Sequence, residues 1–288
     1  MIDLHTHSTA SDGSLTPGEL VALAASRSIC ALALTDHDTM AGLPEAVKAG
    51  EERGIRIISG TEIDISWKPG ECHLLGLGMS GCSPKLEVIF AALARNREQR
   101  NARIVDMLSK QGIVLDFARV AERAGGSVVG RIHFADELVA MGLVKKRQDA
   151  FDKWLAKGHS LFEEKGGVPL EEAIVAVHES GGLAVLAHPM SLFISRSKLS
   201  PLIGQWKELG LDGIEAWHSG AKEGACRYLD ALARELGLLI TAGSDYHGPN
   251  RPDRKLGMTA GKRKIEDHYL EALDEALSKA RMSQGLSP

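Results

Sequence analysis

Histidine and acidic residues recur at the ends of short apolar runs in this sequence. His5 and His7 form an H-x-H pair at the end of the first run, and Asp12 follows shortly after. Side chains two apart on a strand point the same way, so both imidazoles can reach one ion. Further histidines and acids fall at or near the ends of other runs: His37, Glu62, His73, His188, Asp245 and His247.

These six histidines and three acids suit divalent metal ions. Neutral imidazole and carboxylate together favour Zn, Mn or Fe. The set exceeds the roughly four to six ligands that one ion takes, so it predicts two or three ions. A single histidine near a strand end is more often a hydrogen-bonded core residue. Burying this many polar groups without a metal would, however, be very costly.

Seven short β-like runs must position these residues. Strands that alternate with helices favour a parallel sheet with crossover connections, and seven strands suit a β/α barrel better than an open sheet. In such barrels the carboxyl ends of the strands form the active-site face, where we expect the nine side chains to converge. The runs are Ile2–His5, Ala31–Thr35, Arg56–Gly60, His73–Gly76, Leu183–Ala187, Gly213–Trp217 and Leu239–Ala242.

Helical patterns lie between many of the runs. The first helix is signalled by a T-x-x-E capping box, formed by Thr16 and Glu19, with Pro17 at the first helical position. Further helices are expected over Leu43–Arg53, Leu170–Glu179, Ala221–Leu236 and Ile265–Ala280.

Residues 85–169 break this rhythm, because their pattern is helical and charged throughout. We interpret them as a helical insertion that covers the active site, while residues 1–84 and 170–281 form the barrel and residues 282–288 a tail. The alternative is that these helices belong to the barrel wall. The helices expected here are Lys85–Gln111, Asp116–Arg123, His133–Met141 and Lys146–Lys157.

Composition sets broad limits on function. The 288 residues, 44% hydrophobic and 25% charged, suit one large globular domain or a domain with an insertion. The net charge of −4 argues against binding to long nucleic acid. The four cysteines form no C-x-x-C pair and are expected to be reduced thiols. Neither a signal peptide nor a membrane-spanning run is recognised, so we expect a cytoplasmic protein.

Several motifs resemble the PHP (polymerase and histidinol phosphatase) family. They are D-L-H-T-H-S, S-D-G, T-D-H-D, G-T-E, H-L-L-G, A-H-P and G-S-D-Y-H-G, in this order. The resemblance covers the whole chain and implies a distorted seven-stranded β/α barrel with a trinuclear metal site. It implies one ion held by His5, His7, Glu62 and Asp245, a second by Glu62, His73 and His188, and a third by Asp12, His37 and His247.

Within the family, the insertion resembles the branch of 3′,5′-nucleotide bisphosphate phosphatases and 5′→3′ exoribonucleases. The motifs that carry this likeness are Arg97-x-x-Arg100-Asn101 and Gly130-Arg131-Ile132-His133. The sequence departs from the branch in two places. The branch usually has Pro where Ile132 stands, and a Lys-Pro-Ala-Tyr-like stretch where Gly158–Phe162 stands. These departures bear on substrate preference and leave the metal ligands intact.

The resemblance implies a phosphoesterase that acts on 3′,5′-bisphosphonucleotides or the 5′ ends of short RNA. A metal-activated hydroxide would attack phosphorus, and the third ion or His218 would assist the leaving oxygen. Guanidinium groups bind phosphate oxygens bidentately, although the arginine row could instead be a solvated helix face. The candidate substrate residues are Arg97, Arg100, Asn101, Arg103, Arg131, His133 and Ser244.

Three other functions remain open. A phosphatase for a small metabolite such as histidinol phosphate is one, but several arginines in an insertion suit a larger, multiply charged substrate. A metal-dependent amidohydrolase is another, although amide hydrolysis would not require the arginines. A regulatory or proofreading module without activity is the third; such modules should lack ligands, and this chain lacks none. The sequence does not indicate an oligomeric state.

Overall fold

The structure, a computed structural model, describes residues 1–124, 128–156, 158–161, 166–249 and 251–283. It contains two compact units: Met1–Phe90 with Gly167–Pro288, which we call the barrel unit, and Ala91–Gly166, which we call the helical unit. That an insertion over residues 85–169 covers the active site stays a prediction. Lys157, Phe162 and tail residues 284–288, which the sequence predictions included, lie outside the described residues.

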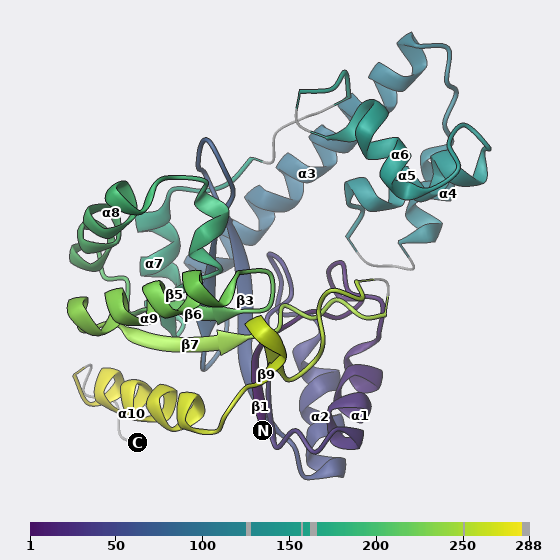
Figure 1. Cartoon of the computed structure of the whole chain (residues 1–288). Helices are drawn as coiled ribbons and strands as arrows, with labels where there is room; N and C mark the ends of the chain where they lie inside the picture. The colour runs from purple at the N-terminus through teal and green to yellow at the C-terminus, as the bar shows by residue number, and fades with distance from the viewer. Residues whose placement is uncertain (125–127, 157, 162–165, 250, 284–288) are drawn as a thin grey trace. The chain divides into compact units, whose positions relative to one another are not determined.

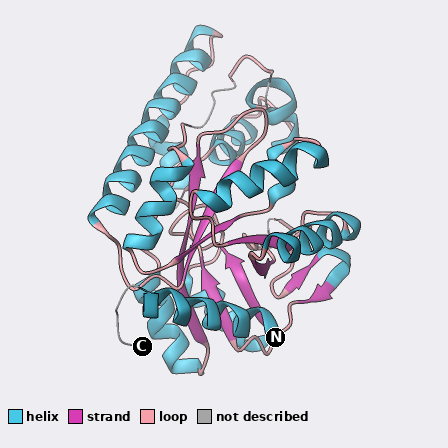
Figure 2. Ribbon diagram, turned by 90° about the vertical axis from the view of Figure 1, so that its left-hand side faces the viewer, coloured by secondary structure: helices cyan, strands magenta, loops and turns pink. Residues whose placement is uncertain are grey.

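Seven strands of the barrel unit form one sheet in the order β1-β2-β3-β4-β5-β6-β7. Its two edges meet where Thr6 bridges Tyr246 and the His7 N–H donates to the Tyr246 carbonyl, at 2.9 Å. The sheet is therefore a nearly closed barrel with helices around it, which confirms the predicted fold class (Figure 1, Figure 2). The strands are β1 Ile2–Thr6, β2 Ala31–Leu34, β3 Arg56–Ile65, β4 Cys72–Leu77, β5 Leu183–Leu186, β6 Gly213–His218 and β7 Leu239–Gly243.

The expected parallel pairing with crossover connections does not hold at β4, which pairs antiparallel with both β3 and β5. Residues 66–71 join β3 to β4 and are too few for a crossover, which needs about a dozen residues or more. The chain therefore turns back as a hairpin, with Ile65 opposite Cys72. As a result, the start of β4, where His73 lies, shares the end of the sheet at which the parallel strands finish.

The barrel helices follow the sequence predictions closely. Thr16 accepts from the Glu19 N–H and Glu19 accepts from the Thr16 N–H, which completes the expected capping box. One helix, α8, was not expected and contains Pro201. The elements are α1 Pro17–Ser26, α2 Leu43–Arg53, α7 Leu170–Glu179, η2 Pro189–Leu192, α8 Arg196–Glu208, α9 Glu223–Leu236, β8 Met258–Thr259, η3 Ala260–Lys262, β9 Arg263–Lys264 and α10 His268–Ser283.

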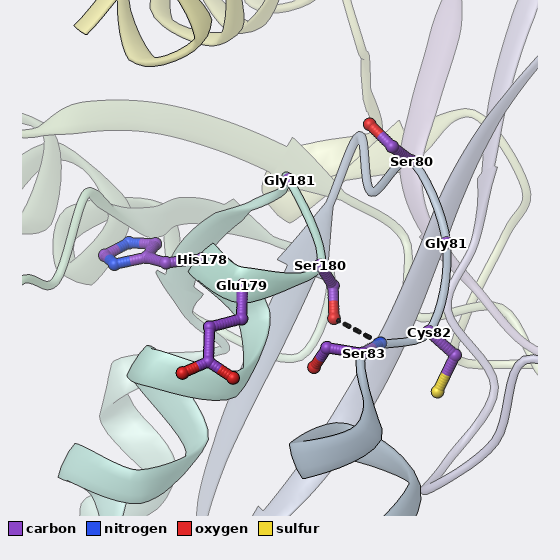
Figure 3. Close-up of a pocket in the computed structure, with 8 residues that line it drawn as sticks. All are labelled: Ser80, Gly81, Cys82, Ser83, His178, Glu179, Ser180 and Gly181. Carbon is purple, nitrogen blue, oxygen red and sulfur yellow. Dashed lines mark hydrogen bonds between the residues drawn. The ribbon is translucent and has the colours of Figure 1, made fainter. Parts of the chain in front are cut away.

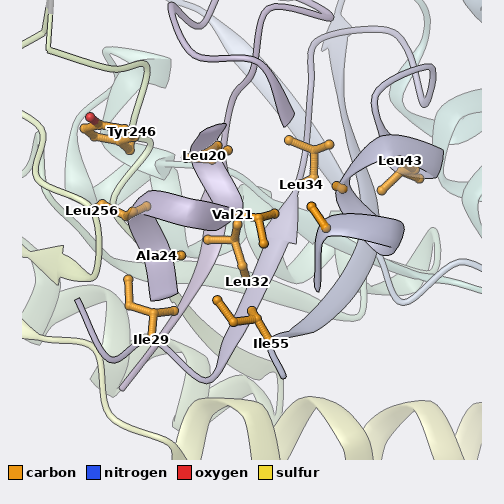
Figure 4. Packing of buried hydrophobic residues seen from close by; sticks show 12 residues of the cluster. Leu20, Val21, Ala24, Ile29, Leu32, Leu34, Leu43, Ile55, Tyr246 and Leu256 are labelled. Atoms are coloured by element: carbon orange, nitrogen blue, oxygen red, sulfur yellow. The ribbon is translucent and has the colours of Figure 1, made fainter. Parts of the chain in front are cut away.

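A hydrophobic core fixes the part of the barrel that carries the first predicted ligands. Leu20 and Val21 of α1 pack with Leu32 and Leu34 of β2 and with Ile55, all nearly or fully buried (Figure 4). Burying each such side chain stabilises the fold by about 1.5–3 kcal/mol. This core holds β2 against α1, and β2 ends shortly before His37.

The helical unit has its own core, which includes Ile104, Leu108, Phe134 and Leu138. Helix α3 begins in the barrel unit and ends in the helical unit. Within the described residues, no helix is both long and apolar enough to cross a membrane. The helices are α3 Pro84–Lys110, α4 Phe117–Arg123, α5 Arg131–Ala140, α6 Arg147–Ala150 and η1 Phe151–Leu155.

Candidate metal centre

Glu62 of β3 lies at the centre of the histidine cluster. Its two carboxylate oxygens face different histidines. Oε1 is 2.8 Å from His73 Nδ1 and 2.8 Å from His188 Nε2. Oε2 lies 3.2–3.3 Å from ring nitrogens of three more histidines, His5, His7 and His37. This division suits a carboxylate that bridges two ions.

The first strand and the last strand bring further ligands to the same place. His5 Nε2 and His7 Nε2 are 3.1 Å apart. Asp245 Oδ1 lies 3.2 Å from His7 Nε2 and 3.3 Å from His247 Nδ1. His247 Nε2 in turn lies 3.2 Å from Asp12 Oδ1. The predicted convergence of residues far apart in sequence therefore exists in the barrel unit.

Three groups of these side chains each have their ligand atoms within 4.8 Å of one another. The first group matches the set that the family resemblance implies for one ion. The structure adds His7 to the predicted third set. In the predicted second set it groups His37 with Glu62 and His73. His188 belongs to none of the three groups, although its Nε2 lies 2.8 Å from Glu62 Oε1, the oxygen that also faces His73. The groups are His5, His7, Glu62 and Asp245; His7, Asp12, His37 and His247; and His37, Glu62 and His73.

The side chains present fit divalent ions. His7 Nδ1 is buried without a hydrogen-bond partner among the described residues, and Asp12 Oδ1 is 3.8 Å away. The Nε2 atoms of His5 and His7 approach each other beside carboxylate oxygens, and a cation would offset this concentration of lone pairs. Imidazole and carboxylate are the donors that Zn, Mn and Fe accept.

The electrostatics of the cluster favour positive charge. Burial alone would raise the pKa of the Glu62 carboxyl, but His37 and His5 outweigh burial and hold that pKa well below its usual range. Burial would lower the pKa of His7, yet Asp245 and Glu62 outweigh burial and raise it to about 10. The carboxylates therefore stay ionised and attract cations.

The backbone is strained where it presents two of the proposed ligands. His188 and Asp245 have positive φ angles of 29° and 53°. Such conformations cost of order 1–3 kcal/mol in residues other than glycine, and they cluster at functional sites. Gly243 allows a close approach in the same region, because a Cβ there would lie 2.3 Å from the His5 Cβ.

Glu215 is a positioning residue that the sequence analysis missed. It is fully buried; its Oε1 lies 3.0 Å from His5 Nδ1 and its Oε2 accepts the His188 N–H at 2.9 Å. It thereby orients two proposed ligands. The pairing of β6 with β7 shifts register between Glu215 and Trp217, and both Glu215 and His218 contact residues of the cluster despite their odd spacing. The signal in the sequence was an acid inside an apolar strand.

Two further contacts orient ligands in the same way. Asp64 Oδ1 lies 3.0 Å from His73 Nε2, on the side of the ring away from Glu62. Ser191 Oγ lies 2.9 Å from His188 Nδ1. Each leaves the other ring nitrogen directed at the cluster, as supporting partners of metal-binding histidines do.

We expect Glu215→Gln to lower metal affinity by about 10- to 100-fold, because an amide orients the His5 ring less strongly than a carboxylate does. Metal titration of the apoprotein would measure this, with activity restored at saturating metal. The matched control is the exposed Glu235→Gln on α9. Unchanged metal affinity in Glu215→Gln would show that Glu215 only fills the core.

His218 lies beside Asp245 of the cluster, and its predicted catalytic role stays a prediction. Its Nε2 is 3.3 Å from Asp245 Oδ2, and its Nδ1 accepts the Gly220 N–H at 3.1 Å. Ser244 is fully buried, and its N–H donates to Asp3 at 2.9 Å. Its role in binding a substrate stays a prediction.

The other predicted substrate residues belong to the helical unit. Arg100 is only 3% exposed, and its guanidinium donates to Asn101 Oδ1 at 3.1 Å. Arg97 is partly buried and Arg103 is exposed, so the arginine row is not a uniformly solvated face. Arg131 and His133 lie at the start of α5. His133 Nδ1 accepts the Gly130 N–H, and Arg131 donates to the Leu155 carbonyl.

A separate cavity of about 510 Å³ lies elsewhere in the barrel unit (Figure 3). Residues 80–83, which follow β4, and residues 178–181, which precede β5, line it. The end of β4 pairs with the start of β5, so this cavity is at the opposite end of the sheet from the cluster. None of the predicted site residues is among those that line it.

Known proteins resemble this chain over most of its length. The model of the PHP domain matches residues 3–156. A 5′-3′ exoribonuclease of Haemophilus influenzae is 37% identical, over 86% of this chain and 90% of the relative. A 3′,5′-nucleoside bisphosphate phosphatase of Chromobacterium violaceum is 35% identical over 90% and 91%. A solved structure from the latter organism, described as an amidohydrolase with bound sulfate and no metal, has a TM-score of 0.83, 32% identity and 96% coverage of both chains.

The strands of this barrel bring histidines and carboxylates together in one cluster, and one relative of the chain is a bisphosphate phosphatase. The protein is therefore a metal-dependent phosphoesterase. The chain belongs to the PHP family.

Proposed function

We propose that this enzyme hydrolyses phosphate esters of nucleotides, either 3′,5′-bisphosphonucleotides or the 5′ ends of short RNA. The observation that carries the proposal is the convergence of nine histidine and acidic side chains, Glu62 among them, in one cluster. The two curated relatives described above, one a bisphosphate phosphatase and one an exoribonuclease, support the substrate class.

We propose two or three divalent ions, of Mn, Fe or Zn, as cofactors. The proposed ligands are His5, His7, Asp12, His37, Glu62, His73, His188, Asp245 and His247. When bound, the ions would supply an activated water nucleophile and neutralise charge on the phosphoryl oxygens.

The chain's own residues would orient the reactants. Glu215 and Asp64 hold the rings of His5 and His73 toward the cluster. His218 lies beside Asp245, where its Nε2 can contact the leaving oxygen of a substrate held at the cluster. The Gly220 N–H faces Nδ1 of the ring at 3.1 Å, and Arg254 Nη1, which can only donate, lies 2.6 Å from Nε2, so both ring nitrogens face donors.

A side-by-side assay tests the substrate class. Metal-reconstituted protein would be given adenosine 3′,5′-bisphosphate, histidinol phosphate, a 5′-monophosphorylated oligonucleotide and a simple amide. The proposal requires the nucleotide or the oligonucleotide to have the highest kcat/KM. A preference for histidinol phosphate would make the enzyme a small-metabolite phosphatase, and turnover of the amide alone would make it an amidohydrolase.

We also propose a cytoplasmic location, in keeping with four free cysteines.

We expect Arg100→Ala and Arg131→Ala to weaken turnover of bisphosphate or RNA substrates without loss of metal. The ions would hold the phosphate being cleaved, so a second phosphate needs its own cationic partner. Loss of one charged hydrogen-bonding partner should cost about 1.5–3 kcal/mol, or roughly one to two orders of magnitude in kcat/KM. Turnover of p-nitrophenyl phosphate should be largely spared.

The control is Arg95→Ala, at an exposed position of α3, the helix that contains Arg100. Equal losses on both kinds of substrate would mean that Arg100 and Arg131 act on the cleaved phosphate. If kcat/KM is unchanged on every substrate, neither arginine binds phosphate, and the main sequence argument for a nucleotide substrate is lost.

A further inference from the structure

A buried carboxylate outside the proposed ligand set joins the segments that carry one group of ligands. Asp36 lies just after β2, directly before the proposed ligand His37, and is only 1% exposed. Its Oδ1 accepts the Ser8 N–H at 2.7 Å and the Ser11 hydroxyl at 2.6 Å, and its Oδ2 accepts the Ser8 hydroxyl at 2.7 Å. No role was predicted for it from the sequence, where the motif T-D-H-D points first to its histidine.

The three residues joined by these hydrogen bonds are each adjacent in sequence to a different member of one ligand group. That group, which we call the Asp12 group, is His7, Asp12, His37 and His247. The adjacent pairs are His7 with Ser8, Asp12 with Ser11, and His37 with Asp36. One carboxylate therefore fixes the chain beside three of the four ligands.

Asp12 depends most on this support, because it lies in a loop and not on a strand. The loop, residues 8–14, begins two residues after the end of β1. The Asp12 side chain is 35% exposed, so little packing holds it. A loop that became ordered only when the ion bound would oppose binding through its lost conformational entropy. Hydrogen bonds that order the loop beforehand remove that cost.

The remainder of the loop follows a tight path that suits this role. The Gly13 N–H donates to the Ser8 carbonyl at 2.9 Å. A Cβ at Gly13 would lie 2.5 Å from the His7 carbonyl oxygen, so the path requires glycine. At the far end, the Ser14 N–H donates to the His247 carbonyl at 2.9 Å. The loop is thus also held by the backbone of the fourth ligand of the Asp12 group.

Asp36 is itself fixed by the strand that carries Glu62. Its carbonyl accepts the Glu62 N–H at 3.2 Å and the Thr61 hydroxyl at 3.0 Å. Hydrogen bonds to a carboxylate are stronger than those between neutral groups. A rigidly held carboxylate can therefore impose its geometry on the loop, as supporting partners of metal ligands do.

We propose that Asp36 is a positioning residue that orders the 8–14 loop through Ser8 and Ser11 before metal binds, and so secures the ion of the Asp12 group. The other two ligand groups contain Glu62 and lack Asp12, so their ions should keep their affinity. This inference rests on the proposed metal centre and deepens it, because it assigns the retention of one ion to a residue that does not bind it.

Titration of the apoprotein with Mn²⁺ tests the proposal. Asp36→Ala should weaken the binding of one ion per chain by about 10- to 100-fold and leave the others at wild-type affinity. Asp36→Asn keeps one acceptor oxygen and should fall between wild type and Asp36→Ala. Asp12→Ala removes a ligand and should weaken the same ion. The double variant should bind that ion within about threefold of Asp12→Ala alone, since changes that act on one ion do not add.

A milder variant guards against loss of the fold, because Asp36→Ala leaves buried donors unpaired. Ser11→Ala removes one of the three hydrogen bonds and should weaken the same ion by about 3- to 10-fold. Its matched control is Ser26→Ala at the exposed end of α1, which should bind every ion as the wild type does.

Hydrogen exchange of the metal-free protein gives a readout that needs no ion. In Asp36→Ala, the amides of residues 8–14 should exchange about tenfold faster, while those of β1, β2 and β3 should exchange as in the wild type. A general loss of stability would accelerate the strands together with the loop.

The proposal is overturned if Asp36→Ala and Ser11→Ala bind every ion with wild-type affinity, if all ions weaken alike, or if exchange in the loop is unchanged. It is also overturned if Asp12→Ala affects no ion, or if its effect adds fully to that of Asp36→Ala. Wild-type protein that binds ions yet hydrolyses no phosphate ester would refute the proposed function alone, and the titration would still test Asp36.

Discussion

Glu62→Gln and Asp245→Asn are each expected to abolish hydrolysis, lowering kcat on the order of a thousandfold or more, while the barrel stays folded. Glu62 contacts five imidazoles through both of its oxygens, so an amide would replace at least one acceptor with a donor. Asp245 joins the His7 side of the cluster to His218. Steady-state kinetics, with circular dichroism as the check on folding, would measure the result.

The matched control is Glu71→Gln, because Glu71 is exposed in the β3–β4 hairpin and undergoes the same chemical change. It should retain wild-type activity. Near-normal turnover of Glu62→Gln with a full complement of metal would refute the bridging assignment, whatever the behaviour of Asp245→Asn.

Removal of metal is the second large effect that we expect. Chelation should eliminate measurable hydrolysis, because the nucleophile in the proposed reaction is water activated by the ions and not a serine or cysteine side chain. Adding back Mn, Fe or Zn should restore it. Elemental analysis of protein purified without chelators should then find two or three ions per chain, because three overlapping groups of ligand atoms are available.

A single site would produce a different titration. One ion or fewer per chain, even after reconstitution, would contradict the multinuclear centre. Activity that persists after exhaustive chelation would refute the proposal that hydrolysis depends on metal. Titration with each metal separately also tells which ion supports turnover at the lowest concentration.

Much of the barrel could be predicted from local signals. Each of the seven strands appears as an apolar run, and the capping box at Thr16 marks the first helix. The direction of β4 could not be read from its composition, because a buried strand is apolar in either direction; only the short hairpin before it decides. Helix α8 escaped prediction because it contains Pro201, which usually marks a helix boundary.

The nine proposed ligands could be found because their type and their place at strand ends both point to metal. Glu215 was missed although an acid inside an apolar strand is a signal, because the direction of its side chain depends on a register shift in β6 that the sequence does not reveal. Arg254 lies in a segment without periodicity, so nothing in the sequence indicates which way it points. The roles of Arg97, Arg100, Arg103, Arg131, His133 and Asn101 stay predictions, because they depend on where the helical unit's surface meets a substrate.

The order of the ligands along the chain has a consequence for synthesis. Six of the nine lie between His5 and His73, and the other three lie between His188 and His247, on the order of a hundred residues later. At roughly 5–20 residues per second, the ribosome would present the early six for several seconds before the rest exist. The barrel is closed by the residues that directly follow β7, where the Asp245 N–H donates to the His5 carbonyl and Tyr246 bridges Thr6, and His247 comes next. The last step of barrel closure and the completion of the ligand set are therefore the same event, so a nascent chain holds an incomplete site until its fold is finished.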